Sequence, residues 1–511
     1  MNQKSLLENF FGSEKKEIMN KDKVNNMKND PLHVGFEENA ASQPLPRGAS
    51  GCHPKVYMKT FGCQMNMRDS EIILEMLQDA GYGVAASIEE ADIALFNTCS
   101  VRQHAEDRVI GNIQKLAGRK KKNPGFVIGV LGCMAARHGE MLFKEYPYLN
   151  IVAGPNSLYE VSELLGKVLG SGEKVSALKN KKRPRKKVGN QYWNGGFSAF
   201  VNIMYGCNNY CSYCIVPYVR GREVSRPKND ILDEIKELVD KGAREITLLG
   251  QNVNSYGKGL TNKITFPELL EAVNGINGVE RIRFTTSHPK DAGKSLFRAM
   301  HDLDKVCESL HLPLQSGSNK ILDLMNRKYS YEDYLKKIHL LRSMVPDVGL
   351  STDIVVGFPS EKESDYKDTY KALEEIEYNS AFIFKYSPRP PALSSCLVDD
   401  VPEEVKKERN NELLALQKRI AYKKNKSLMG TRQEVLIEKV SRMSDKEMAG
   451  RTRGNIACVV QGDENLIGQL VQVEITGNSA YTLKGNIVGA GPPCACPNII
   501  SRVCPNNGAI T

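Results

Sequence analysis

The sequence predicts an α/β protein made of a doubly wound parallel-sheet domain, a partial (βα)6 barrel and a small all-β barrel. Apolar, strand-like runs alternate with amphipathic helical runs over residues 55–154 and again over residues 197–426, which is typical of parallel sheets. From residue 431 the pattern changes to short runs of period two separated by glycine, as in a small barrel.

Length and composition limit the class of protein. With 511 residues, of which 41% are hydrophobic, the chain is long enough for several well-packed domains. Residues 1–50 hold no long apolar run, so we expect neither a secretory signal nor a membrane span. We therefore expect a cytoplasmic protein, whose clustered cysteines bind metal rather than form disulfides. The net charge of +10 permits a nucleic-acid partner without requiring one.

Composition shifts predict six segments along the chain. They are a disordered extension (1–52), a first sheet domain (53–170), a basic linker (171–192), a partial barrel (193–426), a small β barrel (427–490) and a disordered tail (491–511). The basic run at 179–187 is either a solvated tether or a phosphate contact. The cysteines at 494, 496 and 504 leave a metal site as the alternative to a disordered tail.

The first domain is expected to have strands at 55–61, 91–96, 126–131 and 151–153, and helices at 70–80 and 105–116. Cys63, Cys99 and Cys133 each stand just past the carboxyl end of one strand. These ends line one crevice in an open parallel sheet, so the three thiols should converge there. A single cysteine would more often be an inert buried thiol, but three at equivalent positions suggest a metal cluster.

Three cysteines, Cys207, Cys211 and Cys214, form a C-x3-C-x2-C loop directly after a strand-like run. Three thiolates can hold three irons of a 4Fe-4S cluster and leave the fourth iron free to chelate a small molecule. The alternative is a structural zinc loop, which usually needs two pairs of ligands, and no second pair lies nearby in the sequence.

Six strand–helix units after residue 197 predict a partial barrel, whose functional groups should gather at the carboxyl ends of the strands. The expected strands are 197–205, 245–250, 281–286, 309–314, 349–356 and 380–386, with helices such as 231–240 and 331–343 between them. A charged helical run at 402–426 leads out of the barrel. His288, which follows the third strand, is either a functional residue or a turn histidine.

Several motifs resemble the methylthiotransferase family of radical S-adenosylmethionine (SAM) enzymes. They are TFGCQMN at 60–66, NTCSVR at 97–102, GVLGCMA at 129–135, GCNNYCSYCIVPYVRGREVSR at 206–226, HLPLQSGS at 311–318 and TDIVVGFPSE at 352–361. The resemblance implies a methylthiotransferase domain, a radical SAM barrel and a TRAM domain. Two departures stand out: Ser360 replaces a glycine, and Pro391-Ala392 replace Gly-Thr.

Within this family, TLLGQNVNSYG at 247–257 and TTSHP at 285–289 most resemble the member that modifies tRNA. That resemblance implies conversion of N6-isopentenyladenosine at position 37 of tRNA to its 2-methylthio derivative, with two SAM molecules and two 4Fe-4S clusters. The alternatives are a threonylcarbamoyladenosine in tRNA or an aspartate of ribosomal protein S12. A zinc-containing RNA-binding scaffold is the non-enzymatic alternative.

The resemblance also implies roles for particular residues. Cys207, Cys211 and Cys214 would carry the catalytic radical SAM cluster, and Cys63, Cys99 and Cys133 an auxiliary cluster. Contacts to SAM are expected from Tyr213 by resemblance and, by position at strand ends, from Gln251, Gln315, Ser316, Asp353 and Gly357. Strand-end residues also cap and turn the chain, which is the alternative for this second set.

The expected partners are the anticodon stem-loop of a tRNA, an electron donor and a donor of sulfur or clusters. The target base should be flipped out and read by stacking and shape. Arg451 and Arg453, on a probable loop of the small barrel, are the expected RNA contacts.

Overall fold

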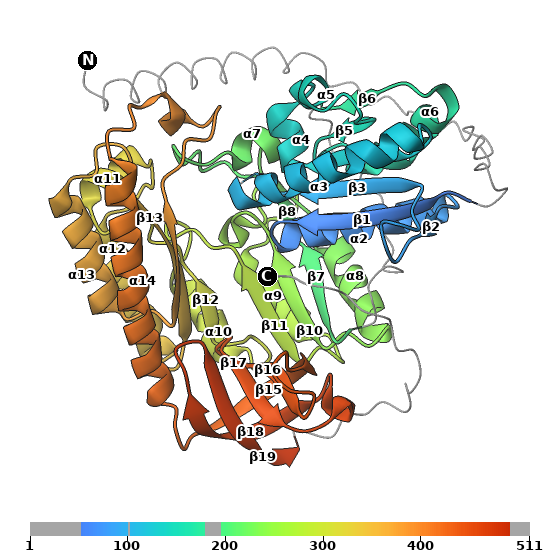
Figure 1. Ribbon diagram of the computed structural model, residues 1–511. Coiled ribbons are helices and arrows are strands. Elements are labelled where there is room, and N and C mark those ends of the chain that lie inside the picture. Colours follow the sequence, from blue (N-terminus) through green and yellow to red (C-terminus); the bar gives the residue numbers. More distant parts are fainter. Residues whose placement is uncertain (1–52, 101–102, 179–195, 491–511) are drawn as a thin grey trace. The chain divides into compact units, whose positions relative to one another are not determined.

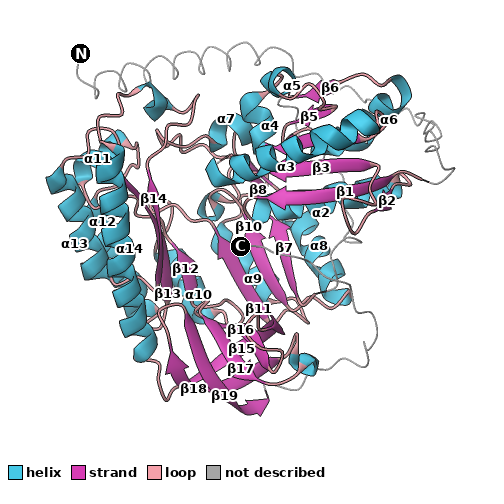
Figure 2. Ribbon diagram, viewed as in Figure 1, coloured by secondary structure: helices cyan, strands magenta, loops and turns pink. Residues whose placement is uncertain are grey.

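The computed structural model describes residues 53–100, 103–178 and 196–490. It separates into two compact units, one up to Ala421 and one from Tyr422 (Figures 1 and 2). The predicted extension at 1–52, the basic run at 179–187 and the tail at 491–511 lie outside the described residues. No helix in the described part of the chain is long and apolar enough to cross a membrane.

The first domain is a six-stranded parallel sheet with strand order β2-β1-β3-β4-β5-β6. The strands are β1 (Lys55–Phe61), β2 (Gly83–Val84), β3 (Ile93–Thr98), β4 (Val127–Gly132), β5 (Ile151–Ala153) and β6 (Val175–Ala177). The helices are α2 (Gln64–Asp79), α3 (Gln103–Lys122), α4 (Cys133–His138), α5 (Met141–Glu145) and α6 (Val161–Ser171).

Helices cover both faces of this sheet. Residues of α2 and α6 pack on one apolar cluster, and residues of α3, α4 and α5 pack on another. The chain runs outward from β1 in both directions, so the strand order reverses between β1 and β3. The predicted doubly wound sheet is therefore confirmed, and ligands in such sheets bind beside this reversal.

Two details of the first domain differ from the prediction. Helix α2 begins at Gln64 rather than at residue 70, because the polar residues of its first turns, including Asn66 and Asp69, are buried and bonded rather than solvated. The edge strands β2 and β6 are only two and three residues long, which is too short for a recognisable period. Strand β6 lies within the segment predicted as a linker.

The barrel consists of two three-stranded parallel sheets, β11-β10-β7 and β12-β13-β14, around one core. A single bridge between Ile282 and Val306 joins β11 to the segment before β12. The strands are β7 (Ser198–Asn202), β10 (Glu245–Leu249), β11 (Arg281–Thr285), β12 (Ser309–His311), β13 (Gly349–Val356) and β14 (Ser380–Lys385), and the short pair β8 (Met204–Tyr205) and β9 (Val224–Ser225) lies beside the cysteine loop.

Helices cover the outer faces of both barrel sheets (Figure 2). They are α8 (Lys228–Asp240), α9 (Phe266–Asn274), α10 (Lys294–Asp302), α12 (Tyr331–Met344), α13 (Glu363–Ile376) and α14 (Glu403–Lys426), whereas the short helices α7 (Val216–Arg220) and α11 (Asn319–Leu324) contribute no residue to this core. Alternate strand residues such as Val201, Ile246 and Ile354 belong to the core beneath these helices, which leaves their neighbours facing the barrel interior. The predicted partial barrel is confirmed.

The second unit is a closed barrel with strand order β15-β16-β17-β19-β18. Its strands are β15 (Arg432–Val440), β16 (Glu447–Thr452), β17 (Ala457–Gln461), β18 (Leu470–Asn478) and β19 (Thr482–Ala490). Val435, Val460 and Val473 are among the side chains that fill its interior. The predicted small all-β barrel is confirmed.

Candidate active site

Cys63, Cys99 and Cys133 converge at the carboxyl ends of β1, β3 and β4, and we call them the assembled triad. The Cys63 thiol forms a hydrogen bond with Cys99, and the negative charge of its thiolate raises the pKa of Cys133. A side chain at Gly62 would come within 2.7 Å of Cys99 Cβ, so a glycine is needed before Cys63. The strand-end prediction thus brought together three residues that are far apart in the sequence.

A network of buried amides fixes the first turn of α2 beside this triad. Asn66 donates to Asn97 Oδ1 at 3.0 Å, and Asn97 donates in return to the Asn66 carbonyl at 2.9 Å. Asn97 Nδ2 also lies 2.9 Å from Ser70 Oγ. The Cys63 thiol donates to Asn66 Oδ1 at 3.3 Å. These bonds explain why such polar residues form a helix. They also hold Cys63 in its orientation.

A buried ion pair lies against the assembled triad. Arg220 Nη2 donates to Asp69 Oδ2 at 3.0 Å, and the two side chains are only 4% and 1% exposed. The hydrogen bond from Cys99 and the positive charge of Arg220 lower the pKa of the Cys63 thiol to about 6. Burial raises the pKa of Cys133, and the charge of Arg220 opposes that shift. The arginine therefore favours thiolates at this site.

A second group of charged residues lies near Cys99 of the assembled triad. Glu106 accepts hydrogen bonds from Ser100 and from Arg137, whose Nη1 is 3.0 Å from Glu106 Oε2. Arg389, from the loop after β14, interacts electrostatically with Glu106 and Cys99. The barrel thus contributes charged groups to the first domain's cysteines from two separate segments, the end of α7 and the loop after β14.

Cys207, Cys211 and Cys214, which we call the loop triad, lie on a loop whose backbone is bound to the segment after α11. Ser212 donates through its backbone to the Met325 carbonyl at 3.0 Å and through its hydroxyl to the Leu324 carbonyl at 2.7 Å. Burial raises the pKa of the Cys207 thiol to about 11 and that of Cys214 above its ordinary value.

Arg327 and His288 approach the loop triad from the barrel. Arg327 Nη1 lies 3.3 Å from Cys211 Sγ and 3.2 Å from the Tyr213 hydroxyl. His288 Nε2 lies 4.0 Å from Cys211 Sγ, and its Nδ1 accepts a hydrogen bond from the backbone of Lys290. His288 is therefore a turn histidine that also faces a cysteine. Burial and the charge of Arg327 keep its pKa well below the ordinary value, so the ring is neutral.

The two triads are joined through helix α7, which begins two residues after Cys214 and ends at Arg220. Cys133 of the assembled triad packs against Ile215 and Val219 of this segment. In a second contact, Gln251 Nε2 of the barrel lies against Met65 Sδ in the first turn of α2. Segments next to the loop triad and next to the assembled triad therefore contact each other in two places.

All six cysteines of the triads are free thiols. Among the described residues, no group of three His, Cys, Asp or Glu side chains is arranged to hold a single metal ion. A 4Fe-4S cluster does not require such an arrangement, because each thiolate binds a different iron. Arg220 Nη1 is buried with no hydrogen-bond partner in the described part of the chain. An acceptor such as a cluster sulfur would satisfy it, so the residues fit the group.

Of the residues expected to contact SAM, Gln251, Gln315, Ser316 and Gly357 follow the carboxyl ends of barrel strands, whereas Asp353 lies within β13 and Tyr213 in the cysteine loop. Several of them contact other protein groups. Gln251 contacts Met65, Asp353 Oδ2 lies 3.2 Å from His311 Nε2, and Ser316 Oγ lies 3.2 Å from Thr369 Oγ1. The backbone of Gln315 donates to the Asp353 carbonyl at 2.9 Å. Contacts of these residues with SAM remain predictions.

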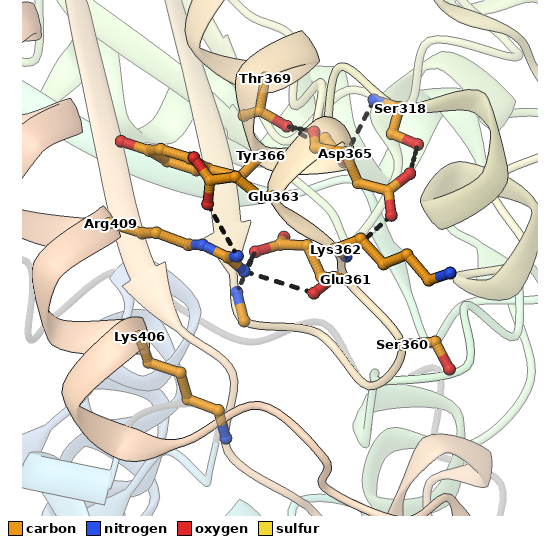
Figure 3. Close-up of polar contacts among 12 residues, drawn as sticks. Ser318, Ser360, Glu361, Lys362, Glu363, Asp365, Tyr366, Thr369, Lys406 and Arg409 are labelled. Atoms are coloured by element: carbon orange, nitrogen blue, oxygen red, sulfur yellow. Dashed lines mark hydrogen bonds and ion pairs between the residues drawn. The ribbon is translucent and has the colours of Figure 1, made fainter.

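Figure 3 shows how the loop after β13, which contains Gly357, is held. Gly357 has a φ of 69° and donates to Glu361 Oε1 at 2.9 Å. Glu361 in turn accepts a hydrogen bond from Arg409 of α14 at 2.7 Å. A carboxylate buried behind the loop thus sets the direction of the Gly357 backbone at the strand end.

Arg451 and Arg453 lie on β16 and in the turn after it, in the second unit. Arg451 Nε lies 3.3 Å from Glu438 Oε1, and Arg453 Nη1 lies 4.0 Å from Glu434 Oε1. Both arginines thus have acidic neighbours on β15, with which a phosphate would compete. Their contact with RNA remains a prediction.

Sequence reasoning missed Asp69, Arg220, Arg327 and the role of His288. Each is brought to a cysteine by a contact between distant segments. The local hydrophobic periodicity of the sequence does not reveal such contacts. The only available signal was that Arg220 falls within the long motif at 206–226.

Comparisons with known proteins agree with this architecture. Residues 55–154 match the uncharacterized protein family UPF0004, residues 201–373 the radical SAM superfamily, and residues 426–488 the TRAM domain. The chain is 47% identical to a tRNA-2-methylthio-N(6)-dimethylallyladenosine synthase of Thermoanaerobacter sp. (strain X514), over 84% of this chain and 92% of the relative. It is 46% identical to the synthase of the same name from Clostridium novyi (strain NT), over 85% and 96%.

Among solved structures, the chain is similar to the radical S-adenosylmethionine methyltransferase TsrM from Kitasatospora setae. The TM-score is 0.49 at 12% identity, and the match covers 67% of this chain and 77% of that one.

The middle domain and its cysteine loop thus define a radical SAM protein that also carries a UPF0004 domain and a TRAM domain. At 44–47% identity over most of its length, the chain belongs to the tRNA-2-methylthio-N(6)-dimethylallyladenosine synthase family.

Proposed function

We propose that this chain converts N6-dimethylallyladenosine at position 37 of tRNA to its 2-methylthio derivative. Family membership supports the reaction, and one structural observation supports the mechanism. Cys133 of the assembled triad packs on Ile215 and Val219, in the segment that directly follows Cys214 of the loop triad. A substrate held between the two triads would contact two metal centres at once, which the insertion of a methylated sulfur requires.

The adenine C2–H bond cannot be broken by a side-chain base at ordinary pKa, so a cofactor must supply the difficult step. Cys207, Cys211 and Cys214 would hold a 4Fe-4S cluster, which would supply the electron for reductive cleavage of SAM and so the radical chemistry at C2. Around it, the backbone bonds of Ser212 fix the loop, and Arg327 donates to Cys211. Cys63, Cys99 and Cys133 would hold a second cluster, which would supply the site for the inserted sulfur, and a second SAM would be the source of the methyl group.

Unpartnered polar atoms support a ligand site at the carboxyl ends of the barrel strands. Both side-chain amide atoms of Asn202, Gln251 Oε1 and Ser287 Oγ are buried without hydrogen-bond partners among the described residues. Such atoms cost roughly 1–3 kcal/mol each unless a ligand satisfies them. They end or follow β7, β10 and β11, where SAM and the flipped adenine would bind. We assign SAM contacts to Tyr213, Gln251, Gln315, Ser316, Asp353 and Gly357 as part of this proposal.

The remaining partners follow from the chemistry. The TRAM barrel, with Arg451 and Arg453, would bind phosphates of the anticodon stem-loop. The reaction also requires an electron donor and a donor of sulfur or clusters, and we propose that the protein meets them and its tRNA in the cytoplasm.

The test is an anaerobic incubation of the reconstituted protein with SAM, dithionite and an anticodon stem-loop RNA that carries the dimethylallyl group. Mass spectrometry should detect a methylthio group on the modified adenosine and no product from the unprenylated RNA. A Cys211→Ala variant should yield none. Product only on a threonylcarbamoyl RNA or on ribosomal protein S12 would refute the substrate, and zinc in place of iron would refute the enzyme.

A further inference from the structure

Arg220 ends the helix that follows the loop triad and lies beside the assembled triad, and its surroundings are unusual for an arginine. Its side chain is 4% exposed, and Nη2 is bound to Asp69. Nη1 has no hydrogen-bond partner among the described residues. A buried N–H group costs free energy unless it meets an acceptor, so one side of this guanidinium requires a partner.

The groups nearest that side are cysteines. The negative charges of Cys133, Asp69 and Cys63 raise the pKa of Arg220, that of Cys133 most, and Cys133 packs against Val219, the residue before Arg220. Asp69 lies in α2 of the first domain, whereas Arg220 ends α7 of the barrel. The ion pair therefore fixes the guanidinium from the same domain that provides the cysteines.

We propose that Arg220 is a positioning residue of the assembled triad, where its guanidinium, held by Asp69, donates to the Cys133 sulfur and stabilises the reduced form of the bound 4Fe-4S cluster. This inference depends on the proposed function, since it requires a cluster on that triad. A cluster becomes more negative when it is reduced, so a nearby cation and N–H···S bonds favour the reduced form. Asp69 partly neutralises that cation and therefore acts in the opposite direction.

Substitutions of Arg220 and Asp69 should therefore shift the reduction potential of the cluster in opposite directions, and this can be tested. The full-length chain, with the loop triad replaced by alanines, would carry only the cluster under study, and its reduced fraction can be followed by electron paramagnetic resonance in a redox titration. At a fixed potential near the parent midpoint, Arg220→Gln should lower the ratio of reduced to oxidised cluster at least about tenfold, which is ~59 mV for a one-electron couple. Asp69→Asn should raise this ratio, and Arg220→Lys should lie between the parent and Arg220→Gln.

Arg226→Gln is the matched control. Arg226 is a partly buried arginine of the next segment, 22% exposed, that pairs with Glu234 at 2.6 Å, and its main charge partners are Glu234 and Tyr205 rather than cysteines. Its substitution should leave the midpoint unchanged. Iron content per chain, measured on every sample, separates loss of the cluster from a change in its potential.

Three outcomes would overturn the inference. One is an unchanged midpoint in Arg220→Gln with full iron content. Another is a shift of the same sign in Arg220→Gln and Asp69→Asn, which would indicate a merely structural role. Absence of iron from the parent chain would instead refute the cluster on the assembled triad, and with it both this inference and the proposed mechanism.

Discussion

Glu361 and Arg409 form a buried ion pair that joins the loop after β13 to helix α14, with 2.7 Å between Glu361 Oε1 and Arg409 Nη1 (Figure 3). The two side chains are 1% and 8% exposed. Because Glu361 also accepts the backbone N–H of Gly357, the pair determines the conformation of a loop at the expected SAM site.

Removal of one partner of this pair should be strongly destabilising. Arg409→Met leaves the Glu361 carboxylate buried without its cation, so we expect a loss of about 3–5 kcal/mol in the free energy of unfolding. Urea denaturation of the metal-free protein measures it. Glu363, the other partner of Arg409, is 61% exposed, so Glu363→Gln should cost less than about 1 kcal/mol. Equal losses in both variants would contradict the assignment.

Asp365 should make stability depend on pH in the acid range. Burial alone would raise its pKa, but hydrogen bonds from Lys320 and Ser318, each at 2.7 Å, bring the pKa below its ordinary value. A carboxyl with a lowered folded pKa stabilises the fold above its unfolded pKa of about 3.9, and this stabilisation is lost as the pH falls through the folded pKa. The pH dependence of urea unfolding below about pH 5 should therefore be weaker in Asp365→Asn. An identical slope in both proteins would refute this role.

Iron content tests whether the dispersed cysteines act together. If each triad holds a 4Fe-4S cluster, the reconstituted chain should bind about eight irons, and Cys99→Ala should retain about four. Cys458, buried in the second unit's core, provides the control: Cys458→Ala should keep the full content. Retention of all the iron by Cys99→Ala would exclude Cys99 as a ligand.

RNA affinity should depend on salt through the TRAM barrel. Replacing Arg451 and Arg453 together by glutamine should weaken stem-loop binding and reduce the slope of log K against log salt by about one per lost phosphate contact. Fluorescence anisotropy at several salt concentrations measures both. Lys236→Gln, at a side chain 60% exposed on α8, is the control for a general loss of charge. If the control and the double variant lowered the slope equally, these arginines would have no particular role.

The sequence allowed prediction of most of the architecture, because strand–helix alternation is a local signal. Strands β5 and β13 begin and end where the pattern placed them, and the converging positions of Cys63 and Cys99 followed from a general rule for parallel sheets. The first turns of α2 were missed because their polar residues are satisfied by distant partners such as Asn97. Arg220 was missed for a similar reason, since Asp69 and the cysteines it meets belong to another domain.

The two triads differ in how much polypeptide separates their members, and this difference has a consequence for biogenesis. The loop triad spans residues 207–214, so a nascent or partly folded segment already holds its thiols close together. The assembled triad exists only after β1, β3 and β4 have paired side by side. Its metallation must therefore wait for the first domain to fold, and a maturation factor that loads it has to recognise native tertiary structure rather than an extended peptide.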